Sequence, residues 1–188
     1  MKKLMLILSL LIVMTVVSNS EESVKSSKVD KFHGKTMYLG VNPLGLILNI
    51  YSGQVGFMLN EGASEFNIPF FYWSPIDDLT LTGAGVEYLW YKDKNGAGLH
   101  YGVTFSVFSV TNSVLSGFGE TKDYSWITYT PGGKVGYRWV WDNGFTLAPS
   151  IGLGYMMGEA DVEDGVTLSS EADPGLTWDV GLGFAFMW

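Results

Sequence analysis

The feature that most constrains the fold of this chain is a strict alternation of large apolar residues with small or polar ones. It is clearest in the C-terminal segment GLTWDVGLGFAFMW, where every second residue is large and apolar: Leu176, Trp178, Val180, Leu182, Phe184, Phe186 and Trp188. Successive side chains of a β-strand point to opposite faces, so this period of two predicts a strand with one apolar face.

Seven earlier segments alternate in the same way, so we expect eight strands in all. The earlier ones span residues 36–50, 52–60, 65–73, 80–92, 97–110, 125–141 and 145–157. The alternation changes phase at Asn42 and Pro43, which predicts a bulge in the first strand. DKNG and DNG are strong hairpin turns, so consecutive strands are expected to pair antiparallel.

The second face of these strands decides between a soluble and a membrane protein. It is made mostly of Gly, Ala, Thr and Ser, and only 16% of the chain is charged, against about 25% in soluble domains. A soluble sandwich would place Lys, Glu, Thr and Ser on its exposed face. Small residues instead suit a narrow lumen and large apolar ones suit lipid. The pattern predicts an eight-stranded antiparallel up-and-down transmembrane β-barrel over residues 36–188.

The N-terminal part has no alternation. Residues 1–20 combine Lys2 and Lys3 with an apolar run and small residues, which is typical of a signal peptide. Residues 21–35 are polar and predict a flexible periplasmic lead-in. The chain has no cysteine, which excludes disulfides and thiolate metal sites, and its net charge of −8 argues against nucleic acid as a partner.

The connections after the second strand alternate between short and long. EGAS, DKNG and DNG are short, whereas SPIDDL, 111–124 and 158–173 are longer, and the link at 51–53 is an exception. Outer-membrane barrels have short periplasmic turns, so both termini are expected on the periplasmic side. Tryptophans near strand ends are expected to form aromatic belts at the membrane interfaces: Trp73, Trp90, Trp126, Trp139, Trp141 and Trp178, with Trp188 at the C-terminus.

The eight alternating strands and the final aromatic strand resemble the small outer-membrane barrels of the OmpA/OmpX type in diderm bacteria. The stretches VNPLGLILNIYSGQVGFMLN and GGKVGYRWVWDNGFTLAPSIGLGY are similar to uncharacterised families of such barrels. The resemblance implies an outer-membrane location, contact with outer-membrane lipid, and recognition of Phe184, Phe186 and Trp188 by the outer-membrane assembly machinery. A terminal Phe is commoner there than a terminal Trp.

An eight-stranded barrel is only wide enough inside for side chains, so an open porin channel is not expected. The inward face carries five polar residues that we expect to form a luminal network: Glu87, His100, Lys134, Arg138 and Asp179. Buried charges must be paired. We therefore expect Arg138 to bridge Glu87 and Lys134 to bridge Asp179, which plugs the barrel; a proton or small-ion path is the alternative.

No residues form a convincing catalytic group, and no cofactor or metal site is predicted. His100 is the one histidine within the predicted barrel, so an outer-leaflet lipid-modifying enzyme is the alternative that would use it. The acidic loop 158–173 contains DVEDG but lacks the ligand spacing of a calcium loop. We expect a monomer with a structural or surface-interaction role, with an extracellular partner bound through this loop. A soluble, lipocalin-like ligand-binding barrel is a further alternative.

Overall fold

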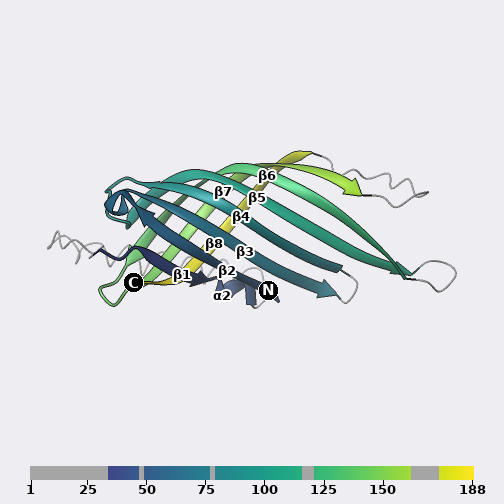
Figure 1. The fold of residues 1–188 in the computed structure, drawn as a ribbon, viewed down its shortest axis with the longest axis horizontal. Helices are drawn as coiled ribbons and strands as arrows, with labels where there is room; N and C mark the ends of the chain where they lie inside the picture. The colour runs from purple at the N-terminus through teal and green to yellow at the C-terminus, as the bar shows by residue number, and fades with distance from the viewer. Residues whose placement is uncertain (1–33, 47–48, 77–78, 116–120, 162–173) are drawn as a thin grey trace, which may run out of the picture. The chain divides into compact units, whose positions relative to one another are not determined.

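A computed structural model describes residues 34–46, 49–76, 79–115, 121–161 and 174–188 (Figure 1). The predicted signal peptide, nearly all of the predicted lead-in and most of the acidic loop lie outside these residues. Within the described ranges, no helix is both long enough and apolar enough to cross a membrane.

Eight strands form one closed antiparallel barrel in which each strand pairs with its sequence neighbours and the last pairs with the first. This confirms the predicted all-β, up-and-down architecture. The strands are β1 (Met37–Val41), β2 (Ile50–Leu59), β3 (Ser64–Ile76), β4 (Leu79–Tyr91), β5 (Gly98–Leu115), β6 (Thr121–Val140), β7 (Phe145–Asp161) and β8 (Gly175–Met187).

The first strand is much shorter than predicted. β1 ends at Val41, and Pro43–Leu46 forms the short helix α2 in place of the predicted bulge. Asn42 accepts a hydrogen bond from the backbone N–H of Gly45 at 3.1 Å, and proline is well suited to the first position of a helix. The link between the first two strands is therefore 42–49, and the predicted exception at 51–53 lies inside β2.

Several segments predicted as loops are strand. The β5–β6 register runs without a break from Gly98↔Arg138 to Leu115↔Thr121, so most of 111–124 extends the hairpin. β3 continues to Ile76 and β4 begins at Leu79, which leaves 77–78 between them. The β-branched residues Val110, Thr111 and Val114 fit a pleated sheet although the residues between them are polar.

One end of the barrel carries three short turns and is called the turn end. The turns are 60–63, which includes the 3₁₀ helix η2 (Asn60–Gly62), 92–97 and 141–144. The Gly96 N–H donates to the Gly62 carbonyl at 2.8 Å, and the Met187 N–H donates to the Gly144 carbonyl at 2.8 Å. Thr36 and Trp188 are joined at the same end by a backbone hydrogen bond of 3.0 Å. The opposite end is called the loop end.

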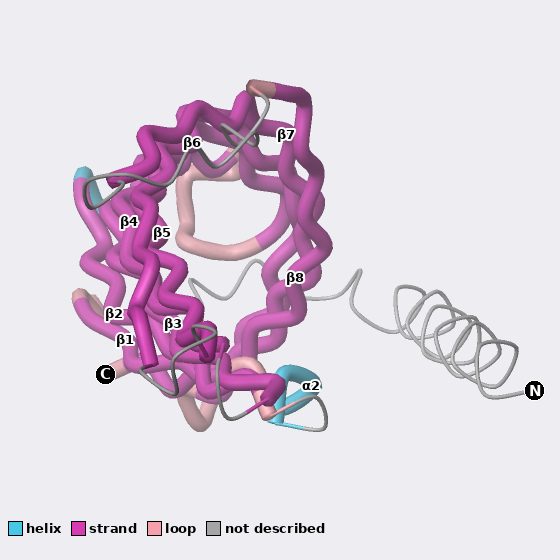
Figure 2. The backbone as a smooth tube through the Cα atoms, turned by 90° about the vertical axis from the view of Figure 1, so that its right-hand side faces the viewer, coloured by secondary structure: helices cyan, strands magenta, loops and turns pink. Residues whose placement is uncertain are grey.

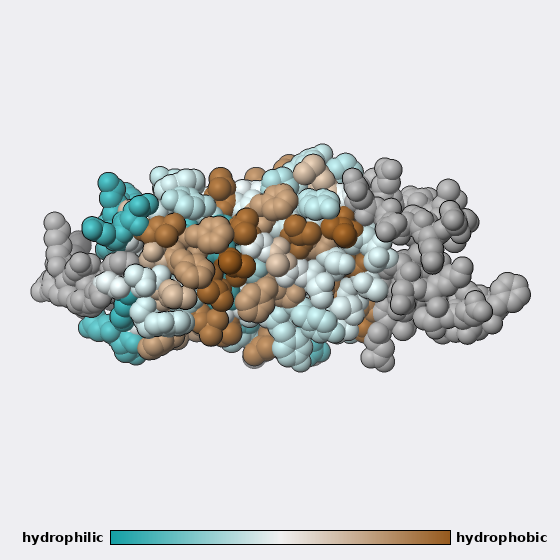
Figure 3. All heavy atoms as spheres, viewed as in Figure 1, coloured by the Kyte–Doolittle hydropathy of each residue, from teal (hydrophilic) through white to brown (hydrophobic). Residues whose placement is uncertain are grey.

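The outward faces of the strands carry large apolar side chains that the protein leaves exposed. The exposed fractions reach 76% at Leu176, 73% at Trp178 and 65% at Val180 on β8. Figure 3 shows hydrophobic residues over the middle of one side of the barrel and hydrophilic ones at the turn end. Several polar side chains are buried instead, among them Ser64, Glu65, Asn67, Glu87, His100, Thr128, Arg138 and Thr146.

The seam between the first and last strands is the shortest ladder of the barrel. It runs from Tyr38↔Met187 to Val41↔Phe184. Beyond Val41, the chain turns into α2, which contacts both β2 and β8 (Figure 2). Among the described residues, the β8 segment before Phe184 has a ladder partner on β7 alone.

Candidate functional site

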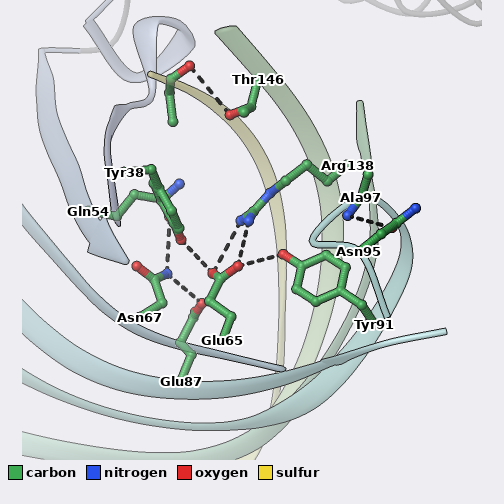
Figure 4. Close-up of polar contacts among 11 residues, drawn as sticks. Tyr38, Gln54, Glu65, Asn67, Glu87, Tyr91, Asn95, Ala97, Arg138 and Thr146 are labelled. Atoms are coloured by element: carbon green, nitrogen blue, oxygen red, sulfur yellow. Dashed lines mark hydrogen bonds and ion pairs between the residues drawn. The ribbon is translucent and has the colours of Figure 1, made fainter. Parts of the chain in front are cut away.

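The lumen near the turn end is filled by four side chains that we call the Arg138 cluster: Tyr38, Glu65, Tyr91 and Arg138. Glu65 lies at the start of β3 and is completely buried. Arg138 donates to both of its carboxylate oxygens, from Nη1 at 2.5 Å and from Nη2 at 3.2 Å. The Tyr38 and Tyr91 hydroxyls each donate to one of the oxygens at 2.5 Å (Figure 4).

The two tyrosines also hold the cation. The Arg138 guanidinium carbon lies 4.6 Å from the Tyr38 ring centroid and 5.4 Å from that of Tyr91. Tyr38 can lie across the lumen because its partner on β2 is Gly56, where any Cβ would overlap the Tyr38 ring. The buried charge is therefore compensated by an ion pair, by hydroxyl donors and by cation–π contacts.

A second group, called the Lys134 cluster, lies beside it and comprises Gln54, Asn67, Glu87 and Lys134. Lys134 forms an ion pair with Glu87. Asn67, on the neighbouring strand, donates its amide hydrogens to Glu87 Oε2 at 2.9 Å and to Gln54 Oε1 at 3.2 Å (Figure 4). This cluster faces the loop end and is partly open, since the Lys134 side chain is 17% exposed.

The predicted ion pairs are wrong in their partners. Arg138 binds Glu65 rather than Glu87, and Lys134 binds Glu87 rather than Asp179. Arg138 pairs with Gly98, the first residue of β5, so it lies at the turn end, where the start of β3 brings Glu65 level with it. Asp179 is exposed, and its carboxylate lies over Gly152 on β7. Glu65 was not predicted as a member of the luminal network, although it alternates in phase with Asn67 on the inward face of β3.

His100 is buried with 2% exposure, and its ring lies 5.3 Å from the Tyr91 ring. Its Nδ1 has no hydrogen-bond partner among the described residues. In the described part of the chain, no group of three or more His, Asp or Glu side chains is arranged to hold a metal ion. His100 thus packs against the Arg138 cluster near the turn end, far along β5 from the loop end.

The tryptophans predicted at the membrane interfaces do not share one face. Trp90, Trp141, Trp178 and Trp188 are exposed. Trp139 is half-buried and lies 4.7 Å from the Tyr137 ring. Trp73 and Trp126 alternate in phase with the inward-facing residues of β3 and β6, and both align with Leu81 and Val110 in one cross-strand row near the loop end. That row makes this part of the lumen apolar.

A cavity of about 210 Å³ extends along the lumen from the Arg138 cluster, past the Lys134 cluster, to Phe71 and Phe108. Its inner wall includes Ser52, Asn67, Glu87 and the Phe71 and Phe108 rings, whose centroids are 5.3 Å apart. The same cavity is also lined by Val41, Gly53, Phe70, Ala84 and Leu182, which lie on the outward faces of their strands.

The residues predicted as an assembly signal lie at the seam. Phe186 and Trp188 are exposed by 53% and 54%, and Phe184 is half-buried with its ring centroid 6.1 Å from that of Phe145. The Trp188 backbone pairs with Thr36 and Met37. Comparisons of the chain with models of protein families, with curated proteins and with solved structures each find no match.

Proposed function

We propose that this chain is a monomeric outer-membrane β-barrel protein with a side-chain-filled lumen and a structural or surface-interaction role. The observation that carries the proposal is the inverted polarity of the barrel. Large apolar residues such as Leu176, Trp178 and Val180 are exposed on the outside, while Glu65 and Arg138 are buried and paired on the inside. In lipid this arrangement is stable, because apolar side chains meet hydrocarbon and polar ones meet one another.

The dimensions of the strands also support a membrane location. β2 has 10 residues and β3, β4 and β8 have 13 each, whereas a tilted transmembrane strand needs about 9–11. The short turns and Trp188 share one end, which supports an orientation with that end in the periplasm. These features support the inference that the chain is a small barrel of the OmpA/OmpX type.

The luminal clusters favour a closed barrel over a channel. The Arg138 cluster spans the lumen from β1 and β3 to β4 and β6 through hydrogen bonds and an ion pair. An ion passing through it would have to displace the buried partners of a fully buried carboxylate, which is strongly unfavourable. A structural protein, or one that acts through its external loops, needs no such path.

The membrane location is tested by fractionation and by gel mobility. We expect the full-length chain to fractionate with the outer membrane, to resist extraction by sarkosyl and to migrate faster in its folded form than after boiling. An unaltered mobility together with release into the sarkosyl-soluble fraction would overturn the proposal and favour the soluble barrel.

The role in surface interaction is tested with the acidic loop. Removal of residues 162–173 should leave the heat-dependent shift in mobility intact, because β7 and β8 pair along Phe145–Met156 without this segment. Loss of binding to a host surface or to another cell with retained barrel assembly would support the interaction role. Retained binding would restrict the proposal to the structural role.

A further inference from the structure

The inward-facing side chains are shielded from solvent at one end of the lumen and accessible at the other. Those toward the turn end are buried: Glu65, Asn67, Glu87, Leu89, His100 and Arg138. Those farther along the same strands are half-buried: Phe71, Gly85, Ser106, Phe108 and Lys134. Asp179 of β8 is exposed although its carboxylate lies inside the barrel, over Gly152. Solvent therefore reaches the loop-end half of the lumen.

The luminal cavity of about 210 Å³ ends at the Arg138 cluster. The ion pair and the tyrosine hydrogen bonds of that cluster join β1, β3, β4 and β6 across the lumen. The cavity is thus closed toward the turn end and accessible from the loop-end half. It can hold a ligand, but it offers no passage through the barrel.

The cavity is surrounded by unmet hydrogen-bonding capacity. Four buried polar atoms of its lining residues have no partner among the described residues: Ser52 Oγ, Asn67 Oδ1, His100 Nδ1 and Arg138 Nε. The amide nitrogen of Asn67 already donates to Gln54 and Glu87, so its unpartnered atom is an acceptor. Buried polar groups without a partner are rare in folded proteins, and a hydroxyl group satisfies both donors and acceptors.

The charges in the lumen select against ions. Lys134 is paired with Glu87, and it is aligned through Gly152 with Asp179, which has no ion pair among the described residues. An anion in the cavity would meet the carboxylates of Glu87 and Asp179. A cation at Asn67 would meet the Lys134 ammonium, since Asn67 and Lys134 both bond Glu87. An unmatched charge in a buried site is unfavourable, so the ligand is neutral.

The wall of the cavity combines polar groups with aromatic surface. Five hydroxyl or amide side chains line it: Ser52, Gln54, Asn67, Ser106 and Ser150. The Phe71 and Phe108 rings, with centroids 5.3 Å apart, supply the apolar part. A ring with hydroxyls at its rim and C–H groups on its faces matches both kinds of surface. The volume is below the roughly 300–1,000 Å³ of pockets for drug-sized molecules, so it suits a single ring.

We propose that the luminal cavity binds a neutral monosaccharide, or a cyclic polyol of the same size, that enters from the loop-end half. The ligand hydroxyls donate to Asn67 Oδ1 and bond Ser52 Oγ, and its C–H face packs against Phe71. This inference goes beyond the proposed function. It requires the closed barrel and its cavity, but it does not require the membrane location.

The test uses the full-length chain, labelled with ¹⁵N and folded in an amine-oxide detergent, which carries no sugar headgroup. Methyl glucoside and myo-inositol are titrated in and followed by NMR. We expect saturable shifts of the Asn67 side-chain amide and the Ser106 backbone amide, and none at Ile151 and Leu153 on the outside. Glucosamine and glucuronate, which carry opposite charges on a similar ring, should bind about tenfold more weakly.

Two variants and a matched control test the position of the ligand. Ser106→Phe fills the cavity and should weaken methyl glucoside binding at least about tenfold, whereas Ser109→Phe, on the outward face of the same strand, should leave it within about twofold. Ser52→Ala removes a hydroxyl that has no protein partner, so the barrel should keep its stability while affinity falls about fivefold. The heat-dependent mobility shift verifies that each variant is folded.

The inference is overturned if neither neutral probe gives saturable shifts in the folded chain, because the cavity then holds water alone. Equal affinities for the neutral and the charged sugars would overturn the neutral ligand, and equal losses in Ser106→Phe and Ser109→Phe would overturn the luminal position. These outcomes leave the membrane location intact. Saturable binding by a chain that is released into the sarkosyl-soluble fraction would instead refute the proposed function and support the luminal site.

Discussion

Arg138 of β6 and Glu65 of β3 face each other across the lumen and are joined by two hydrogen bonds, of 2.5 Å and 3.2 Å. The two strands are not neighbours, since β4 and β5 lie between them. The ion pair therefore acts as a cross-brace between distant parts of the sheet, and removal of either charge leaves the other buried without compensation.

Arg138→Met should destabilise the barrel by about 3–5 kcal/mol, because Glu65 keeps its charge in a fully buried position. Urea-induced unfolding in lipid vesicles, followed by tryptophan fluorescence, measures the change. The double variant Glu65→Leu/Arg138→Met should be destabilised less than Arg138→Met alone, since no unpaired charge remains. If the destabilisation of the double variant equals the sum of the two single destabilisations, the two residues are not coupled.

Arg138→Met also tests whether the luminal side chains close the barrel to ions. We expect Arg138→Met to remain silent in single-channel recordings, because Tyr38, Tyr91 and the Lys134 cluster still fill the lumen. A clear rise in conductance with unchanged stability would contradict the closed lumen and favour the ion path.

Gly56→Ala should destabilise the barrel by about 1–3 kcal/mol, because the added Cβ overlaps the Tyr38 ring and pushes its hydroxyl away from Glu65. Gly133→Ala is the matched control, since its Cβ would make only an ordinary contact of 3.4 Å with the Gly102 carbonyl. Unfolding in urea compares the two. Equal stabilities of the two variants would mean that Tyr38 can leave the Arg138 cluster without destabilising the barrel.

Ile151→Arg tests whether the outward face meets lipid. Ile151 is 52% exposed, so in a water-soluble barrel the change should alter the stability by no more than about 0.5 kcal/mol. Near the middle of a bilayer an arginine on the lipid face destabilises by about 2–4 kcal/mol. Vesicle-based unfolding distinguishes the two, with Asp142→Arg in an exposed turn as the control expected to be neutral.

Trp188 is expected to act in two separable ways: its backbone hydrogen bonds stabilise the seam, and its side chain is part of the proposed assembly signal. Trp188→Ala keeps the backbone hydrogen bonds to Thr36 and Met37, so it should fold normally in vitro, but slow assembly in cells if the side chain is part of the recognition signal. Deletion of Trp188 removes those bonds as well and should destabilise the seam in vitro. Normal assembly of Trp188→Ala in cells would restrict the signal to Phe184 and Phe186.

The strand pattern was predictable because the large outward residues repeat with period two in every strand. The helix α2 was missed because the apolar residues of VNPLGLILNI also alternate, so the strand pattern concealed a helix start at Asn42 and Pro43. The extension of β5 and β6 was missed because polar residues of 111–124 resemble a loop, although they pair in register.

The luminal residues were predictable as a set but not as pairs. Glu87, Lys134 and Arg138 were identified from the inward phase of their strands. Their partners depend on the stagger between strands that are distant in sequence, and this stagger places Arg138 level with Glu65 and Lys134 level with Glu87. Alternation within a strand carries no information on that stagger.

The short seam between β1 and β8 also determines where the closed barrel opens first. β1 and β8 share the shortest ladder, while β5 and β6 are paired from Gly98↔Arg138 to Leu115↔Thr121. Amide hydrogens at Leu39 and Val41 should therefore exchange with solvent deuterium long before those in the middle of β5, since local opening follows the fewest hydrogen bonds. By the same reasoning, the β1–β8 joint should be the last to form, so the nascent barrel exists first as an open curved sheet.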